Sequence, residues 1–282
     1  MLSKAYVEIT NVCNLNCSFC PKTTRMPRFM SESEFSAIAE KLAGRVRYVY
    51  LHVMGEPLLH PEFGDILDIC ARRSIKAIIT TNGTLLASDN AEKLLASPAV
   101  YKVSVSLHSY EANAENVSLA EYLSNVTSFI KRAADRGIIS VMRLWNLDGD
   151  GTHGQNELND EIIGYLRGVF RDKWIETRSG QRVADKTYIE WGEKFEWPDP
   201  EAEYRGADGY CYGVHDQIGI LADGTVVPCC LDHNGDVPLG NIYDSSLSEI
   251  LSSARALNMV SGFKNRKMTE DMCRRCGFAR KF

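Results

Sequence analysis

Segments typical of β-strands alternate with segments typical of helices along the first two thirds of the 282-residue chain, and this alternation limits its fold more than any other feature. Strands joined through helices pair in parallel as βαβ units. The expected strands are residues 4–10, 46–53, 75–81, 100–107 and 138–145, and the expected helices are residues 31–42, 62–73, 88–96, 115–136 and 157–170. With residues 187–191 as a possible sixth strand, the pattern predicts an α/β fold, either an open partial (β/α)6 barrel or a doubly wound sheet.

The pattern changes after residue 172. Residues 172–210 are polar, aromatic and rich in acids, and we interpret them as a linker or as a loop that covers a site. Residues 217–221 and 225–228 flank the turn-forming pair Asp223-Gly224 and predict a β-hairpin. Residues 246–259 predict a helix. We therefore expect two domains, residues 1–195 and a small domain of a β-hairpin plus a helix at residues 196–282.

The charge balance limits the class of partner. Thirty-two Lys and Arg residues oppose 37 Asp and Glu residues, which gives a net charge of −5. This balance argues against a general nucleic-acid-binding protein, which normally carries a basic surface. No apolar run approaches the roughly 20 residues of a membrane-spanning helix, and the start MLSKAYVEIT lacks the apolar segment of a signal peptide. We therefore expect a cytoplasmic protein with neither nucleic acid nor a membrane as partner.

Nine cysteines give the clearest indication of chemistry. In a reducing compartment they are not expected to form structural disulfides, and clustered cytosolic thiols usually bind metal. Cys70 stands apart in the apolar pattern FGDILDICARR and is interpreted as a small hydrophobic residue on a helix face. The other eight fall into two groups, Cys13, Cys17 and Cys20 near the start, and Cys211, Cys229, Cys230, Cys273 and Cys276 near the end.

The first group, in the segment CNLNCSFCP, directly follows the first expected strand. A structural zinc site uses four ligands, and an ordinary electron-carrier cluster uses four cysteines. Three thiolates on a [4Fe–4S] cluster would leave one iron open to an exogenous ligand. A zinc site completed by a distant histidine is the alternative.

This segment resembles the CxxxCx(aromatic)C signature of radical S-adenosylmethionine (radical SAM) enzymes. The resemblance implies that Cys13, Cys17 and Cys20 hold a [4Fe–4S] cluster, and that the amino and carboxylate groups of S-adenosylmethionine bind the open iron. In this family one electron from the reduced cluster cleaves the sulfonium, and the resulting 5′-deoxyadenosyl radical takes a hydrogen atom from the substrate.

Residues near later strand ends extend the resemblance over residues 4–170. Met54-Gly55-Glu56-Pro57 is similar to the family's GGEP motif, which holds the cofactor ammonium, with Met54 in place of the first glycine. The Thr-Asn-Gly segment at residues 81–83 is similar to the family's TNG segment. The resemblance further implies that Phe19 packs beside the adenine of the cofactor, that Ser106 lies near its ribose and that Arg143 lies near its carboxylate. Asn82 of the TNG segment is a further expected cofactor contact.

The second group resembles the opening of the SPASM and Twitch extensions of radical SAM enzymes. The resemblance implies one auxiliary [4Fe–4S] cluster with a complete ligand set, Cys211, Cys229, Cys273 and Cys276. Cys230 is the alternative to Cys229 as a cluster ligand, but the spacing of Gly224 to Cys229 favours Cys229. A zinc ribbon is the alternative for this group.

The overall layout is most similar to 2-deoxy-scyllo-inosamine dehydrogenases within the family. This implies two-electron oxidation of an alcohol, with the auxiliary cluster as electron acceptor and a flavodoxin- or ferredoxin-type protein as reductant. Modification of a peptide or protein (cross-linking, epimerisation or maturation) is the alternative reaction, although the first strand begins too early for an N-terminal peptide-recognition domain. A zinc-stabilised binding module is the alternative outside enzymology. His108 and Arg143 are the candidate catalytic residues, with Glu190 and Glu193 as further candidates for substrate contact.

Overall fold

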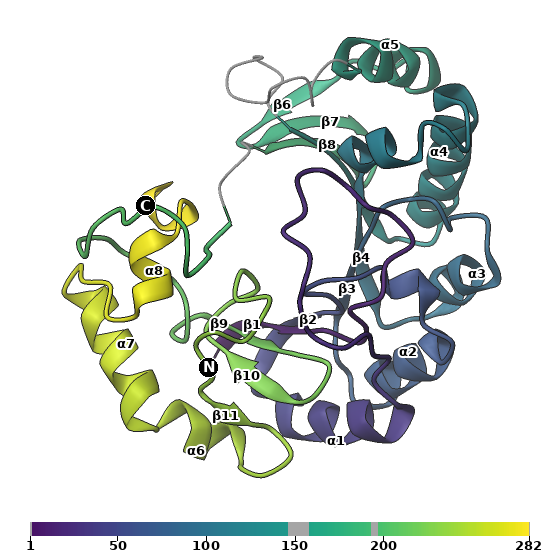
Figure 1. The fold of residues 1–282 in the computed structure, drawn as a ribbon. Helices are drawn as coiled ribbons and strands as arrows, with labels where there is room; N and C mark the ends of the chain where they lie inside the picture. Colours follow the sequence, from purple (N-terminus) through teal and green to yellow (C-terminus); the bar gives the residue numbers. More distant parts are fainter. Residues whose placement is uncertain (1, 146–157, 193–196, 282) are drawn as a thin grey trace.

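The computed structural model describes residues 2–145, 158–192 and 197–281 of the chain. The strands are β1 (Leu2–Val7), β2 (Val46–Tyr50), β3 (Ala77–Thr81), β4 (Val100–Ser106), β5 (Ile139–Trp145), β6 (Ile175–Thr177), β7 (Gly180–Ala184), β8 (Thr187–Gly192), β9 (Gln217–Ile220), β10 (Thr225–Val227) and β11 (Gly240–Asn241). In the described part of the chain they form one sheet in the order β11-β10-β9-β1-β2-β3-β4-β5-β8-β7-β6 (Figure 1).

The centre of this sheet is the predicted partial barrel. Strands β1, β2, β3, β4, β5 and β8 pair in parallel, each with the next, so that residues 187–192 supply the sixth strand. The connecting helices are α1 (Glu32–Leu42), α2 (Phe63–Arg72), α3 (Asp89–Ala96), α4 (Leu119–Asp135) and α5 (Asn159–Val169). Figure 1 shows them along the outer side of the curved sheet. The partial barrel, rather than the doubly wound sheet, is thus confirmed.

Local sequence chemistry places the first helix after the cysteine-rich loop. Ser31 caps α1, because its hydroxyl accepts a hydrogen bond from Glu34 N–H and the Glu34 carboxylate accepts one from Ser31 N–H. This reciprocal capping satisfies donors that a helix start otherwise leaves unpaired. Four apolar residues of α1 then face the sheet, namely Phe35, Ile38, Ala39 and Leu42.

The interpretation of residues 172–210 as a linker or loop is wrong for its first part. Strands β6 and β7 form an antiparallel hairpin that extends the sheet from β8. Every residue of β6 is exposed, so this edge strand lacks the apolar alternation by which strands are recognised in a sequence.

The opposite edge confirms the predicted β-hairpin. Strand β9 pairs in parallel with β1 and antiparallel with β10. The turn needs its glycine, because Gly224 has φ +86° and a Cβ there would lie 2.4 Å from the Tyr243 ring. Through β9 the C-terminal region continues the sheet of the barrel, and the domain division near residue 195 stays a prediction.

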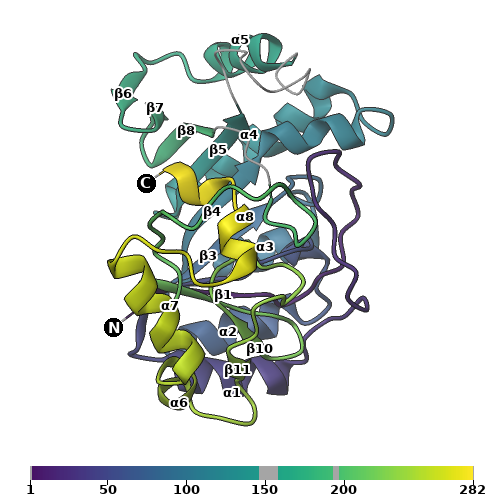
Figure 2. The ribbon, with the colours of Figure 1, turned by 60° about the vertical axis from the view of Figure 1, so that its left-hand side comes forward.

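The expected helix at residues 246–259 is two helices, α6 (Leu247–Leu251) and α7 (Ala254–Lys264). Ser253 has an extended backbone and its hydroxyl caps α7 by accepting from Ala256 N–H, so the chain ends one helix and starts another. A third helix, α8 (Asp271–Arg275), precedes the last residues. Figure 2 shows α8 in front of the barrel strands, on the inner side of the sheet.

The hydrophobic core lies between the sheet and the outer helices. Its largest fully buried side chains include Phe35, Phe63, Leu67 and Phe129. Cys70 is also fully buried, on the α2 face that packs into this core. Cys70 therefore packs as a small hydrophobic residue of the core, as its apolar surroundings in the sequence indicate.

Candidate active site

One cavity of about 1000 Å³ lies on the inner side of the curved sheet. It is lined by both groups of cysteines and by almost every residue that the sequence predicts to contact the cofactor or substrate. The predicted residues in its lining are Cys13, Cys17, Cys20, Cys211, Cys229, Cys273, Cys276, Phe19, Met54, Gly55, Glu56, Asn82, Ser106, His108, Arg143 and Glu190. Pro57 is buried as the first residue of the 3-10 turn η1 (Pro57–Leu59) and does not line the cavity. Glu193 lies outside the described residues.

The loop after β1 presents Cys13, Cys17 and Cys20 to this cavity. The carbonyl oxygen of Cys17 accepts hydrogen bonds from Cys20 N–H at 3.3 Å and from Lys22 Nζ at 2.9 Å, which fixes the turn between two of the thiols. Burial raises the pKa of Cys17 to about 11, so a thiolate there needs a cation to offset its burial. Three thiols on one loop fit the iron–sulfur cluster that the sequence predicts.

Glu56 connects two segments of the site. Its Oε1 accepts a hydrogen bond from Leu58 N–H at 3.1 Å, and its Oε2 accepts one from Asn82 N–H at 2.7 Å. The side chain is buried, and burial raises its pKa to about 7. A carboxylate in such a place gains from a cationic partner, so the geometry is compatible with the predicted contact to the cofactor ammonium.

Gly55 explains why this motif needs glycine. Its backbone has φ +78°, and a Cβ there would lie 2.4 Å from the carbonyl oxygen of Thr10. The next residue, Glu56, donates its N–H to Val12 O at 2.9 Å. The motif thus lies directly against the segment that leads into the cysteine loop, and any side chain at residue 55 would separate the two.

Glu8 is a site residue that the sequence analysis missed. Its buried carboxylate forms an ion pair with Arg25, with 2.7 Å between Glu8 Oε1 and Arg25 Nη1. It also accepts hydrogen bonds from Met54 N–H at 3.1 Å and from Ala222 N–H at 3.2 Å. One carboxylate therefore joins the cysteine loop, the cofactor motif and the C-terminal hairpin. An acidic residue between apolar strand residues was the available signal.

Aromatic rings surround Phe19 beside the cysteine loop. Phe19 contacts Trp145 and His108 edge-on, with ring centroids 4.4 and 5.0 Å apart, and His108 stacks on Trp145 at 4.2 Å. Burial, followed by the charge of Arg143, lowers the pKa of His108 to about 3. The imidazole is therefore neutral and a weak proton acceptor, and this packing favours a positioning role for His108 over the predicted role as a base. Trp145 was not predicted.

Charged residues face the cavity from neighbouring strands. Arg143 on β5 is in register with Ser106 on β4 and with Glu190 on β8. Lys102 on β4 lines the same cavity, and burial lowers its pKa. Since these positions alternate along strands toward the inner face, the barrel offers both cationic and anionic groups to a bound molecule.

The second group of cysteines lines the other part of the cavity. Cys211 Sγ accepts a hydrogen bond from Gly213 N–H at 3.3 Å, and Cys276 N–H bonds to Cys273 O at 3.3 Å. Burial raises the pKa of all four predicted ligands, and the thiol of Cys229 interacts electrostatically with Cys211 and Cys273. Four thiols that line the same part of one cavity suit a cluster with a complete ligand set.

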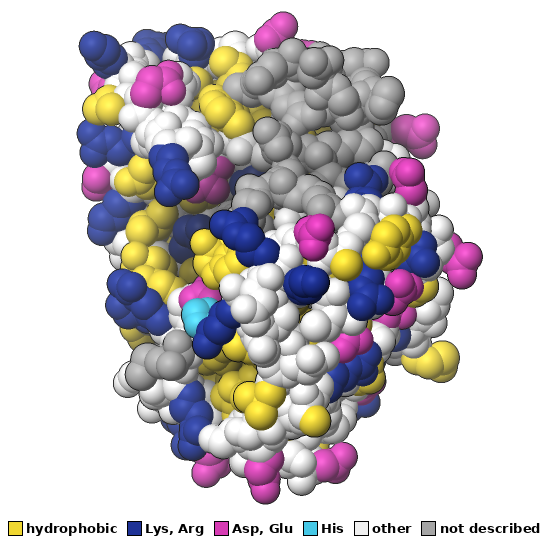
Figure 3. Space-filling view, turned by 90° about the vertical axis from the view of Figure 1, so that its left-hand side faces the viewer, with side chains coloured by type: hydrophobic (Ala, Val, Ile, Leu, Met, Phe, Trp, Pro, Cys, Tyr) yellow, Lys and Arg dark blue, Asp and Glu magenta, His cyan; other side chains and the backbone are white. Residues whose placement is uncertain are grey.

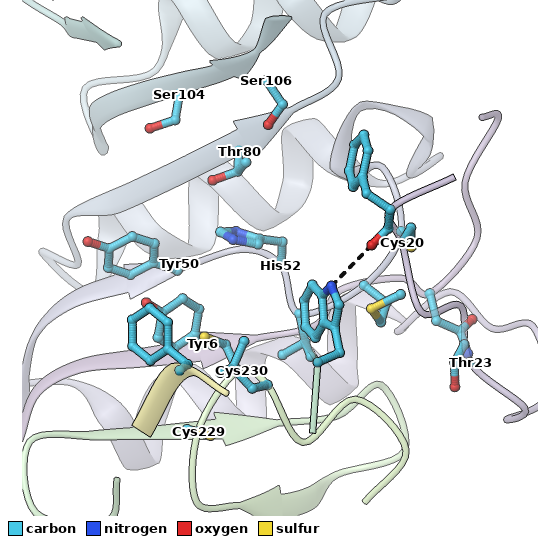
Figure 4. A pocket seen from close by; sticks show the side chains of 18 of the residues that line it. Tyr6, Cys20, Thr23, Tyr50, His52, Thr80, Ser104, Ser106, Cys229 and Cys230 are labelled. Carbon is cyan, nitrogen blue, oxygen red and sulfur yellow. Dashed lines mark hydrogen bonds between the residues drawn. The ribbon is translucent and has the colours of Figure 1, made fainter. Parts of the chain in front are cut away.

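The segment that begins at residue 197 lies against the regions around both groups of cysteines. Trp197 Nε1 donates to the carbonyl oxygen of Phe19 at 3.2 Å (Figure 4), and its ring meets His233 edge-on at 5.8 Å. Trp197 and Pro198 line the cavity. The later part of residues 172–210 is thus placed as a covering segment would be.

The surface drawn in Figure 3 mixes Lys and Arg with Asp and Glu side chains, in keeping with the small net charge. In the described part of the chain, no helix combines the length and the apolar character needed to cross a membrane.

Comparison with known proteins agrees with this geometry. A family model described as the radical SAM superfamily matches residues 7–154, and a SPASM model described as an iron–sulfur cluster-binding domain matches residues 211–277. The first match implies S-adenosylmethionine and a [4Fe–4S] cluster, and the second implies auxiliary iron–sulfur chemistry. These matches favour iron–sulfur clusters over the zinc alternatives.

Three similar proteins illustrate the range of relatives. The sporulation killing factor maturation protein SkfB of Bacillus subtilis (strain 168) is 25% identical, over 93% of this chain and 67% of its own length. The structure of BtrN with AdoMet and 2-DOIA has a TM-score of 0.57 at 16% identity, covering 98% of this chain and 93% of BtrN. The structure of Streptococcus suis SuiB bound to the precursor peptide SuiA has a TM-score of 0.57 at 15% identity, covering 99% of this chain and 70% of SuiB.

The structural similarities show a shared fold, and the family assignment rests on the sequence. The radical SAM model spans residues 7–154, more than half of the chain, and includes the cysteine loop, the Met54–Pro57 motif and the strand ends that line the cavity. This chain therefore belongs to the radical SAM superfamily and carries a C-terminal SPASM domain.

Proposed function

We propose that this protein removes a hydrogen atom from one carbon of a ribosomally made peptide and thereby takes part in the maturation of that peptide. The observation that carries the proposal is the alignment with SkfB, named as a maturation protein, which runs along 93% of this chain. The structural similarity to SuiB bound to a precursor peptide supports the same class of substrate.

The geometry of the cavity supports hydrogen abstraction inside the barrel. The predicted cofactor contacts and the second group of cysteines line the same space of about 1000 Å³. That volume is at the upper end of small-molecule sites, roughly 300–1000 Å³. With S-adenosylmethionine in place, the remaining space suits one residue of a peptide rather than a folded domain.

The chain's own residues have separable tasks in this proposal. Cys13, Cys17 and Cys20 would hold the cluster, which when bound supplies the electron for cofactor cleavage, while Glu56 and Asn82 would position the cofactor. Phe19, His108 and Trp145 form an apolar wall that limits access of water to the reacting carbon. Cys211, Cys229, Cys273 and Cys276 hold an auxiliary cluster.

Oxidation of a small alcohol is the second candidate. It is favoured by the similarity to BtrN, whose chain is matched over 93% of its length. An auxiliary cluster beside the substrate would accept the second electron of such an oxidation. Burial lowers the pKa of His108 to about 3, which makes it a weak acceptor for the alcohol proton, so this candidate has weaker support from the site.

Formation of 5′-deoxyadenosine distinguishes the two substrates. Anaerobic, cluster-loaded protein is reduced with dithionite and given S-adenosylmethionine with either 2-deoxy-scyllo-inosamine or the short peptides encoded beside this chain's own gene. The proposal predicts that a peptide stimulates 5′-deoxyadenosine formation. The mass or the chromatographic retention time of that peptide should also change. Stimulation by the aminocyclitol, with no response to the peptides, would support the dehydrogenase instead.

A further inference from the structure

The inner face of the barrel carries hydroxyl groups that none of the predicted cluster or cofactor contacts uses. Thr80 on β3 and Ser104 on β4 are paired in register, and both line the cavity. Figure 4 shows their side chains, with that of His52, on the side of the cavity away from Cys20 and Thr23. Within the described part of the chain, the hydroxyls of Thr80 and Ser104 form no hydrogen bond to another residue. Both are therefore available to a ligand in the cavity.

Lys102 lines the cavity next to these hydroxyls. It precedes Ser104 by two residues on the same face of β4, and because a strand rises about 3.3 Å per residue, the two Cα atoms are about 6.6 Å apart. The register partners of Lys102 are Ile78 on β3 and Ile139 on β5, so the neighbouring strands present no carboxylate at its level. The side chain is half-buried, and burial lowers the pKa of its ammonium. A partly buried charge of this kind gains from an anion that a ligand brings.

Glu190 is the carboxylate on the inner face that lies nearest in register, but it lies opposite another cation. It pairs with Arg143 on β5, which in turn pairs with Ser106 on β4, four residues beyond Lys102. The charge of Glu190 favours the charged form of Lys102, but this effect is smaller than the effect of burial. Glu190 therefore belongs to the level of Arg143 and does not neutralise Lys102.

Lys4 on β1 is the other lysine of this region, and its surroundings differ from those of Lys102. Its Nζ lies 6.0 Å from the centroid of the Tyr50 ring, within cation–π range. Its N–H donates to the carbonyl oxygen of Asp216 at 3.3 Å, and the Asp216 carboxylate accepts a hydrogen bond from the Ser3 hydroxyl at 2.7 Å. Lys4 thus has an aromatic ring and an acidic residue close to it. Lys102 has neither an ion pair nor a cation–π contact with any residue that the structure describes.

We propose that Lys102, together with the hydroxyls of Thr80 and Ser104, binds a carboxylate of the substrate, so that the peptide places an aspartate or glutamate side chain inside the barrel. This inference rests on the peptide substrate proposed above. One ammonium and two hydroxyl donors match a carboxylate, whose two oxygens carry one negative charge and each accept more than one hydrogen bond. Ser106, the predicted ribose contact, follows Ser104 on the same face of β4. The acidic residue is therefore the modified residue or its immediate neighbour.

A double-mutant cycle tests the pairing of Lys102 with an acidic side chain. The peptide that stimulates 5′-deoxyadenosine formation is prepared with each acidic residue changed singly to its amide. With wild-type protein, one of these changes should raise KM about tenfold to hundredfold, as expected for a lost hydrogen bond to a charged group. Lys102→Met should raise KM for the unchanged peptide by a similar factor and should show no further loss with that amide.

Two further variants control this experiment. Lys102→Arg keeps the charge and should discriminate between acid and amide as wild type does. Lys173→Met removes an exposed lysine and should also behave as wild type. If the losses from Lys102→Met and from the amide add independently, or if no acidic position of the peptide affects KM, carboxylate binding by Lys102 is wrong while peptide modification stands. Iron content and circular dichroism establish that each variant is folded.

A second measurement needs no peptide substrate and uses the wild-type protein. Anaerobic, cluster-loaded protein with S-adenosylmethionine is acetylated with an N-hydroxysuccinimide ester, and the modified lysines are mapped by peptide mass spectrometry. N-acetylglutamate N-methylamide should slow acetylation of Lys102 but not of Lys173, and the corresponding glutamine compound should slow neither. Equal acetylation of Lys102 with the two compounds would overturn the proposal. If no peptide stimulates cofactor cleavage, peptide modification fails, and this measurement still decides whether Lys102 binds a carboxylate.

Discussion

The Glu8 carboxylate and the Arg25 guanidinium form an ion pair at 2.7 Å in which the Glu8 side chain is fully buried and that of Arg25 is 15% exposed. Arg25 also donates through Nε to the carbonyl oxygen of His233 at 2.9 Å. The pair thereby joins the end of β1, the cysteine loop and the C-terminal region. The proposed chemistry requires both groups of cysteines to face one substrate. This contact holds the cysteine loop and the C-terminal region in place relative to each other.

Replacing Glu8 with glutamine should destabilise the protein. The change keeps the size of the side chain but leaves the Arg25 charge without its partner, and loss of one partner of a buried pair typically costs about 3–5 kcal/mol. Urea unfolding of Glu8→Gln measures the effect. Glu115→Gln, at an exposed position, is the control and should unfold like wild type. Equal midpoints for wild type and Glu8→Gln would show that the ion pair contributes little.

Glu56 should make cofactor binding depend on pH. Burial raises its pKa to about 7, and only the charged carboxylate attracts the ammonium of S-adenosylmethionine. As the pH rises through about 7, the carboxylate loses its proton and affinity should increase, most steeply within about one pH unit of that value. Equilibrium dialysis with unreduced, cluster-loaded protein gives the dissociation constants.

The Glu56→Gln variant should lose most of this pH dependence. It should also bind the cofactor about tenfold to a hundredfold less tightly, since a hydrogen bond to a charged group contributes roughly 1.5–3 kcal/mol. Its iron content should equal that of wild type. Unchanged affinity with intact iron would mean that Glu56 only shapes the backbone between Leu58 and Asn82.

Protonation of His60 should lower the free energy of unfolding at acidic pH. Its Nε2 donates to Met30 O at 2.8 Å and its Nδ1 accepts from Glu62 N–H at 3.1 Å, so both contacts together require the neutral ring. Burial lowers the pKa of His60 below 6.5, so the unfolded chain takes up the proton first as the pH falls below about 6.5. The free energy of unfolding should therefore decrease in that range and be unaffected above it.

Comparison with a variant isolates this histidine. His52 and His108 also have lowered pKa values and Glu56 a raised one, but these groups are shared by wild type and His60→Asn. Between pH 7.5 and pH 5.5, wild type should lose more stability than His60→Asn in urea unfolding. Identical losses in the two proteins would exclude His60 as a contributor.

Local patterns were enough to predict most of the barrel and the cysteine loop. Strand β4 and helix α1 have apolar periodicities that depend on a few neighbouring residues, and the cysteine spacing is itself local. Strand β6 has no buried face, so it gave no such signal. The break at Ser253 was missed because a serine inside an apolar pattern is compatible with a continuous helix until its hydroxyl is seen to cap the next one.

The missed site residues depend on contacts between distant parts of the chain. Glu8 gains its role from Ala222 and Arg25, and Trp145 gains its role from Phe19. The pairing of β9 with β1 likewise joins segments from opposite ends of the chain. A sequence read in short windows contains no record of these pairings, which the curvature of the sheet creates.

Reductive cleavage of S-adenosylmethionine tests the central claim most directly. Anaerobically reconstituted wild-type protein, reduced with dithionite, should convert S-adenosylmethionine to 5′-deoxyadenosine and methionine, detected by liquid chromatography and mass spectrometry. The variant with Cys13, Cys17 and Cys20 all replaced by alanine should lose about half of its iron, because one of the two clusters expected for this chain is held by these thiols, and it should form no 5′-deoxyadenosine. Undiminished cleavage by that variant would contradict the assignment of the catalytic cluster to the loop after β1.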